Sequence, residues 1–236
     1  MAGTVEHLAV ALELIKKWGE NQSDFQEERA VTLQNSGLFL AGNICPDGIM
    51  ARKNYQRPMK MHTHFRDGIM DYEFHFSENL QIFHQRIRQF AHQNIKPCSE
   101  NRDLYLGYLT HILTDEVFML TIRPKFMEKI APLGLTDRDA KTFEYFTYDV
   151  NQIDFRLAKE YPGMSQAYAV LKNSPPYEIT GWITQEELTD SRTWILDFFF
   201  EKAPEPEMPV FYTYKEALQF ISDAVDIIDK RVLEHI

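Results

Sequence analysis

The segment that decides the fold is residues 103–122, DLYLGYLTHILTDEVFMLTI. Its apolar side chains recur at spacings of three and four residues, the period of an α-helix: Leu106, Leu109, Leu113 and Val117. His111 and Asp115 are four residues apart, so their side chains lie one turn apart on the same helix face. The segment therefore predicts a helix that buries apolar residues and carries a polar pair able to reach one metal ion.

The helical period continues through most of the chain, without convincing strand alternation. Besides 103–122, helices are predicted over residues 4–19, 25–40, 71–93, 136–161, 184–202 and 213–231. Three of them open on a pattern that resembles a capping box: Thr136 with Asp139, Thr184 with Glu187, and Thr213 with Glu216. We expect Pro124 to end or offset its helix, and residues 45–70 to form a long ordered loop. These patterns predict an all-α single domain over residues 1–236, a bundle of about seven to nine helices.

The composition limits the class of protein. The 236 residues include 35 acidic and 25 basic side chains, a formal net charge of −10, and 44% are hydrophobic. The apolar content excludes intrinsic disorder, and the acidic balance argues against non-specific nucleic-acid binding and against docking on an anionic membrane. No apolar run approaches the roughly 18 residues of a membrane span, and the N-terminus does not resemble a signal peptide. Because Cys45 and Cys98 form no disulfide framework, we expect a cytoplasmic protein.

Other segments carry side chains suited to binding a metal. Asp47 directly follows a proline at a helix-ending break, where the restricted backbone can aim its carboxylate. His62 and His64 alternate, so on an extended segment at most one of them faces a given ligand. His7 lies in the first turns of the first helix. Taken singly, each of these residues is more often a turn, loop or packing residue than a metal ligand.

The remaining histidines and cysteines carry less information. His75, His84 and His92 lie on one predicted helix without a completing acid, and we interpret them as solvated or packing residues. Cys45 is more typical of a buried apolar residue than of a thiolate ligand. The chain contains neither a phosphate-binding P-loop nor a G-x-S-x-G nucleophile motif, so nucleotide cradling and serine hydrolysis are not expected.

Taken together, four elements resemble the zinc-dependent phospholipase C family, and more closely its small bacterial intracellular relatives. They are Thr4-Val-Glu-His7-Leu, Gly42-Asn-Ile-Cys-Pro-Asp47, His64-Phe65 and Gly107-Tyr-Leu-Thr-His111-Ile-Leu-Thr-Asp115. Their order along the chain is the order in that family, and the resemblance is strongest up to Asp115. It implies the all-α phospholipase C / P1 nuclease fold, with metal ligands projecting from helices into a cleft.

The resemblance also implies a set of roles. Asp47, His64, His111 and Asp115 would bind one Zn²⁺, and His7 would bind a neighbouring metal with Asp115 bridging the two. His64 fits the family's His-Phe position better than His62 does. Other divalent metals are alternatives to zinc, and no organic cofactor site is expected. Asp47 and Asp115 are the expected catalytic residues, because either carboxylate could accept a proton from an activated water.

One departure from the family pattern concerns a further metal site. Secreted members hold an additional metal with two histidines and an acid that follow the His-x-x-x-Asp motif. This chain has no histidine between Asp115 and His235, so that site is absent or built from carboxylates. Asp149 and Asp154 are the candidates, although acids on a helix surface are the commoner interpretation.

The sequence thus predicts a metal-dependent hydrolase, most specifically a phosphoesterase. The expected partner is a small phosphate ester, with a lipid-like ester among the candidates; nucleic-acid binding and stable membrane insertion are not expected, and no pattern predicts an oligomeric state. The alternative is a non-catalytic helical protein with a structural metal. An HD-type phosphohydrolase ranks low, because that class needs an adjacent His-Asp pair that this chain lacks. The run Phe198-Phe199-Phe200 is expected to pack in the core.

Overall fold

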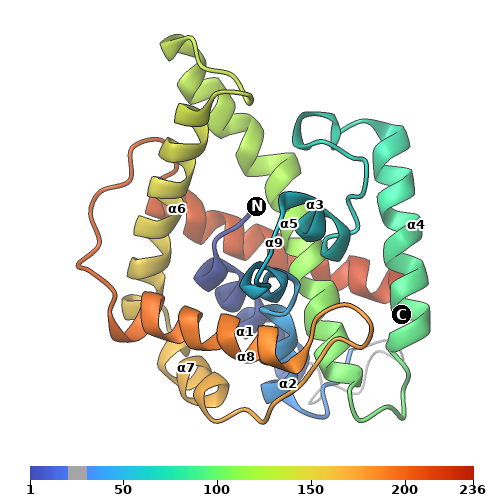
Figure 1. The fold of residues 1–236 in the computed structure, drawn as a ribbon. Coiled ribbons are helices and arrows are strands. Elements are labelled where there is room, and N and C mark those ends of the chain that lie inside the picture. The colour runs from blue at the N-terminus through green and yellow to red at the C-terminus, as the bar shows by residue number, and fades with distance from the viewer. Residues whose placement is uncertain (21–30) are drawn as a thin grey trace.

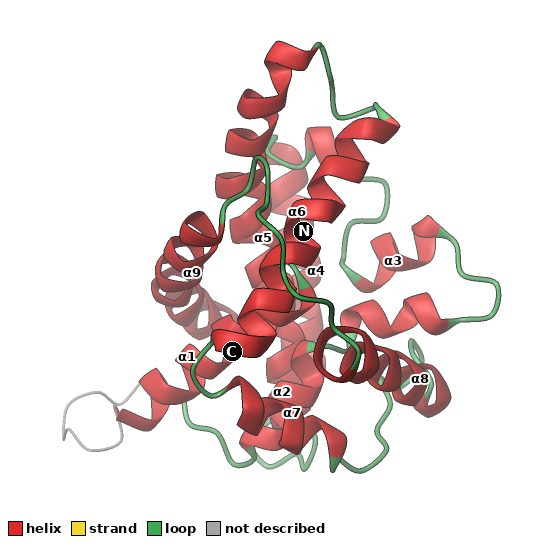
Figure 2. Cartoon of the chain, turned by 90° about the vertical axis from the view of Figure 1, so that its left-hand side faces the viewer, coloured by secondary structure: helices red, strands yellow, loops and turns green. Residues whose placement is uncertain are grey.

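The structure, a computed structural model, describes residues 1–20 and 31–236. The protein is 71% helical, and the described residues form no strand (Figure 2). The α-helices are α1 (Thr4–Glu20), α2 (Ser36–Asn43), α3 (Arg57–Thr63), α4 (Ser77–Asn94), α5 (Arg102–Ile130), α6 (Ala140–Glu160), α7 (Met164–Lys172), α8 (Gln185–Leu196) and α9 (Tyr214–His235). Short 3₁₀ segments cover Pro46–Ala51, Asp71–Glu73 and Ala131–Leu133, and a π-helical turn, Asp197–Glu201, continues α8. The prediction of an all-α multi-helix bundle is confirmed.

Helix α5 is the central element of the fold (Figure 1). Every residue from Asp103 to Met119 is buried, since α1, α2, α4 and α9 all pack against this helix. The first half of α5 is therefore surrounded by other helices, which is typical of a core helix. Buried apolar side chains of the described residues join one cluster that extends from α1 to α9.

Two glycines allow α2 and α5 to approach closely. A Cβ added at Gly42 would lie 1.9 Å from the carbonyl oxygen of Leu104, and one at Gly107 would lie 2.0 Å from that of Phe39. Any larger residue would force the helix backbones apart, because neither carbonyl can rotate away. The close crossing holds the end of α2, at Asn43, against the turn of α5 that carries His111.

Several predicted boundaries differ from the structure. Residues 25–30 of the predicted 25–40 helix lie outside the described residues. The described helix there begins at Ser36, where the Asn35 side chain accepts from the backbone N–H of Leu38. The prediction of a loop over 45–70 was wrong, because this segment folds into the 3₁₀ turn Pro46–Ala51 and helix α3. Both are too short to show a hydrophobic period. Pro124 does not end its helix, since α5 continues to Ile130.

Two of the three predicted capping boxes are confirmed, those in which a Glu follows three residues after the Thr. Thr184 with Glu187 and Thr213 with Glu216 form complete capping boxes at the starts of α8 and α9. At the third position the Asp139 carboxylate instead accepts from the backbone N–H of Thr136, and α6 starts at Ala140. Helix α7 was not predicted. Among the described residues, no helix combines the length and apolar character needed to cross a membrane.

Candidate metal centre

The structure brings the five predicted ligands together from four elements. His7 comes from α1, Asp47 from the 3₁₀ turn, His64 from the C-terminal cap of α3, and His111 and Asp115 from α5. Asp115 lies between the histidines: its Oδ1 is 3.2 Å from His7 Nε2, and its Oδ2 is 3.6 Å from His64 Nε2 and 3.9 Å from His111 Nε2. Asp47 Oδ1 is 3.2 Å from His64 Nε2. All three histidines are buried, as is Asp115.

Hydrogen bonds on the far side of two rings determine which nitrogen faces the centre. His111 Nδ1 lies 2.8 Å from the carbonyl oxygen of Asn43, and His64 Nδ1 lies 2.9 Å from that of Lys60. A carbonyl can only accept, so each Nδ1 carries the hydrogen. In the neutral imidazole each Nε2 then presents a lone pair inward. Backbone carbonyls orient metal-binding histidines in the same way in known metal sites.

The two inward nitrogens nevertheless lie only 3.3 Å apart. Burial lowers the pKa of His64, and burial together with the neighbouring His7 lowers the pKa of His111 well below its ordinary value. Both rings are therefore neutral near pH 7, and two lone pairs face one another without a hydrogen between them. A cation held by both nitrogens would turn this repulsion into attraction.

The carboxylates of the centre are ionised. Burial alone would raise the pKa of Asp47, but the Lys60 ammonium beside it outweighs that effect and holds the pKa well below its usual range. Burial likewise opposes ionisation of Asp115, and the contact with His7 outweighs it, so the Asp115 pKa is also lowered. Lys60 Nζ lies 2.6 Å from Asp47 Oδ1 and forms an ion pair with this carboxylate.

Some buried polar atoms of the centre make no hydrogen bond to the described residues and are therefore available to a ligand. Within the described part of the chain, His7 Nδ1 and Asp115 Oδ2 are buried without a hydrogen-bond partner. The His7 ring stacks on that of His111 with the centroids 3.7 Å apart. The other carboxylate oxygen of Asp115 accepts from the backbone N–H of Ala2 at 3.0 Å.

The separations fit a divalent ion. Ligand atoms about 2.0–2.2 Å from a tetrahedral zinc lie roughly 3.3–3.6 Å apart, which is close to the nitrogen–nitrogen and nitrogen–oxygen distances found here. Two overlapping groups qualify as metal-binding sets: His7 with His111 and Asp115, and Asp47 with His64 and His111. His111 belongs to both sets, but its one inward lone pair, on Nε2, can bind only one ion, so a second ion would need His7 and the Asp115 carboxylate.

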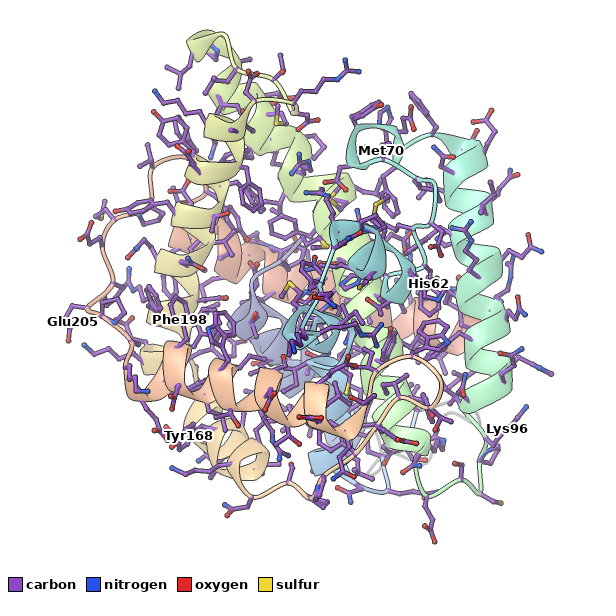
Figure 3. All side chains as sticks on the ribbon, in the orientation of Figure 1. His62, Met70, Lys96, Tyr168, Phe198 and Glu205 are labelled. Atoms are coloured by element: carbon purple, nitrogen blue, oxygen red, sulfur yellow. The ribbon has the colours of Figure 1, made fainter. Side chains whose placement is uncertain are left out.

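The neighbouring histidine does not share this position. His62, labelled in Figure 3, is exposed, and its Nδ1 lies 3.0 Å from a carboxylate oxygen of Asp67. The expectation that only one of the pair faces the centre therefore holds, but its reason was wrong. Both residues belong to the end of helix α3 rather than to an extended strand.

The residues expected to lie outside the centre do so. His75 and His92 are exposed, and His84 pairs with the buried Glu116, its Nε2 lying 2.7 Å from the carboxylate. Cys45 is fully buried and its thiol donates to the carbonyl of Ala41, as expected for a packing residue. Phe199 is buried in the core, and Phe198 (Figure 3) packs against it.

Asp149 and Asp154 are not the surface acids that the commoner interpretation expects, because both are buried. Asp149 accepts three backbone N–H groups, those of residues 210–212, at 2.6 to 2.8 Å. Asp154 accepts from the backbone N–H of Glu6 at 3.0 Å and so caps the start of α1. Neither joins a metal-binding set among the described residues. Their positions explain their burial without a further metal.

Two basic side chains beside the centre were missed from the sequence: Lys60 and Arg66. Lys60 precedes His64 by four residues, a spacing that places both on one face of a helix, whereas the sequence predicts a loop for this segment. Arg66 is buried behind His64 because the backbone reverses at Phe65, whose φ is 57°. A phenylalanine gives no sequence signal for this left-handed conformation.

No family model, curated protein or solved structure matches this chain.

Proposed function

We propose that the protein is a metal-dependent hydrolase that acts on a phosphate ester, with zinc as the preferred ion. The observation that carries the proposal is the 3.3 Å approach of His64 Nε2 and His111 Nε2, both lone-pair atoms, beside two ionised aspartates. Burying such a group costs several kcal/mol unless a cation compensates it. The mixture of imidazole and carboxylate ligands suits zinc better than magnesium or calcium, which prefer oxygen.

The residues of the centre would have three roles: binding the ion, orienting the ligands that bind it, and accepting a proton from water. His7, His64 and His111 would hold the ion, and the carbonyls of Asn43 and Lys60 fix two of these rings. When bound, a divalent cation lowers the pKa of water and stabilises negative charge on phosphate oxygens. Asp115 Oδ2 is buried without a hydrogen-bond partner in the described residues, so this oxygen can accept a proton from water at the centre. Asp47 is the second candidate base, and Lys60 keeps it ionised.

The resemblance to the zinc-dependent phospholipase C family supports the same proposal. Its implied ligand positions, His7, Asp47, His64, His111 and Asp115, are the residues that converge in space. A cytoplasmic location belongs to the proposal as well. It is supported by the cysteines, since Cys45 is buried, Cys98 is exposed, and both are free thiols.

The test combines metal analysis with an activity panel. Protein purified without chelator is analysed for metals and assayed on p-nitrophenyl phosphate and bis(p-nitrophenyl) phosphate, before and after treatment with chelator and re-addition of zinc. We expect about one or two zinc ions per chain and hydrolysis that chelator abolishes and zinc restores. Asp115→Asn should lose metal and activity together. Asp67→Asn, which removes an exposed carboxylate that pairs with His62, is the matched control and should lose neither.

Two results would contradict the proposal. Protein that holds no metal and binds none when zinc is added would refute the metal centre. Protein that holds zinc tightly yet hydrolyses neither ester would favour the non-catalytic alternative, in which the metal only stabilises the fold.

A further inference from the structure

Arg66 is a buried cation that the proposed centre does not use. Only 5% of the residue is exposed, and its side chain lines a small cavity together with His64 and Asp115. Its Nη1 donates to Asp71 Oδ1 at 2.8 Å, but the contact of its Nη2 is the thioether sulfur of Met1 at 3.2 Å. A thioether is a weak acceptor, so one end of a buried guanidinium lacks a strong partner.

The backbone around Phe65 turns Arg66 toward the cavity. Helix α3 ends with two crossed hydrogen bonds, from Arg66 N–H to the Met61 carbonyl at 2.8 Å and from Phe65 N–H to the His62 carbonyl at 3.1 Å. This arrangement is a Schellman motif, in which the left-handed residue is usually glycine. Phe65 takes that conformation while its ring packs against Phe90. The consequence is that His64 and Arg66, two residues apart, both line the same cavity.

Asp71 accepts a hydrogen bond from one end of the Arg66 guanidinium, Nη1, and leaves the Nη2 end to another partner. The other oxygen of Asp71 accepts from Arg57, whose side chain is 65% exposed, at 2.7 Å. One carboxylate is thus divided between two guanidinium groups, one at the surface and one inside. A guanidinium has five N–H donors in a planar fork that matches the oxygens of a phosphate. The Nη2 end of Arg66, whose partner is a weakly accepting thioether, therefore suits an anionic oxygen that arrives with a ligand.

Resting on the proposed function, we propose that Arg66 binds a non-bridging oxygen of the substrate's phosphoryl group, and that the substrate is a phosphomonoester. A phosphomonoester has three non-bridging oxygens, whereas a diester has two. Two oxygens can be held at the histidine–aspartate centre, and the third, present only in the monoester, reaches Arg66. Met1 occupies this position in the structure, and its contacts there are weak ones, to Arg66 and, from its amine at 3.9 Å, to the sulfur of Met119.

Inorganic phosphate is the first probe. Isothermal titration of the zinc-loaded protein with phosphate is compared for wild type, Arg66→Gln and Arg57→Gln, with metal content measured for each. Both substitutions remove a guanidinium from Asp71, but only the first removes one from the cavity. We expect Arg66→Gln to weaken phosphate binding about tenfold or more with unchanged zinc content, and Arg57→Gln to change it less than about twofold.

Activity on the two model esters gives the second readout. Wild type should prefer p-nitrophenyl phosphate to bis(p-nitrophenyl) phosphate, and Arg66→Gln should lose kcat/KM by a much larger factor on the monoester than on the diester. Arg66→Lys keeps the charge and loses the planar fork; if Arg66→Gln fails to fold, this variant should still bind phosphate more weakly than wild type. Competition by glycerol 3-phosphate and by phosphatidate in micelles then identifies a soluble or a lipid phosphomonoester.

Three outcomes separate this inference from the proposed function. If Arg66→Gln or, failing that, Arg66→Lys folds, keeps its zinc and binds phosphate like wild type, Arg66 has no such role. If wild type hydrolyses the diester faster than the monoester, the substrate class is wrong although the phosphoesterase proposal survives. If zinc-loaded wild type neither binds phosphate nor hydrolyses either ester, both fail.

Discussion

The crossing of α2 and α5 gives the sharpest test of how the fold builds the centre. Gly107→Ala would place a Cβ 2.0 Å from the carbonyl oxygen of Phe39 and 2.9 Å from the backbone nitrogen of Asn43. Ordinary contact begins at 3.4 Å, so the two helices must separate locally by about 1.4 Å. Overpacking of this kind costs about 1–3 kcal/mol, and the alanine returns up to about 1 kcal/mol of helix propensity. The net expectation is a loss of about 1–2 kcal/mol in the free energy of unfolding.

The same displacement should reach the metal centre. Asn43 belongs to the helix that must move, and its carbonyl holds His111 Nδ1 at 2.8 Å. Loss of such an orienting hydrogen bond typically lowers metal affinity about 10–100-fold. Gly107→Ala should therefore weaken zinc binding, although residue 107 is not a ligand.

Urea unfolding of the metal-free protein and zinc titration against a competing chelator measure both effects. Gly19→Ala is the matched control: this glycine is also helical, but a Cβ there meets nothing within 4 Å. It should leave zinc affinity unchanged and stabilise the protein slightly. A Gly107→Ala protein with wild-type stability and wild-type zinc affinity would refute the coupling between the helix crossing and the centre.

Three further predictions concern charged groups. Lys60→Met removes the ammonium that lies 2.6 Å from Asp47 Oδ1. In urea unfolding, the metal-free protein should lose about 3 kcal/mol in its free energy of unfolding, because the Asp47 carboxylate is left unpaired. Zinc affinity should rise because no cation then competes for Asp47, and an unchanged affinity would contradict the prediction. Asp149→Ala should lower the free energy of unfolding by about 3 kcal/mol, because the backbone N–H groups of residues 210–212 would be left without an acceptor. Its zinc content should not change, and a loss of zinc would make Asp149 part of a metal site. Burial lowers the pKa of His235 below 6.5, so the stability that its neutral ring contributes is complete above pH 6.5 and is lost as the pH falls. Between pH 7 and 5, wild type should therefore lose more of its free energy of unfolding than His235→Gln. Equal losses in the two proteins would contradict this prediction.

The part of the fold that the sequence predicts is the part with a sustained period. Long helices such as α5 and α9 show three or more turns of apolar spacing. Capping threonines mark the starts of α8 and α9. Helix α3 has seven residues and no apolar period, so its presence depends on tertiary contacts. One such contact is the hydroxyl of Tyr108, which donates to the Thr63 carbonyl at 2.5 Å and ties the end of α3 to α5.

In the candidate site, too, the sequence predicts the residues that one helix brings together and not those that the tertiary fold brings together. His111 and Asp115 could be paired from their spacing, because the geometry within one helix is fixed. That His7, Asp47 and His64 join them rested on resemblance, since no local rule relates residues on different elements. Lys60 and Arg66 could not be placed without knowing that α3 is helical and that Phe65 reverses the chain. The burial of Asp149 and Asp154 depends likewise on backbone N–H groups supplied by distant segments.

The most direct test of the central claim is anomalous diffraction at the zinc absorption edge from crystals grown with zinc. We predict an anomalous peak between His64 and His111, about 2.0–2.2 Å from both Nε2 atoms and within ligand distance of Asp115. The account would be contradicted by crystals that show no peak there while the two nitrogens remain in contact, or by a zinc ion bound only at other residues.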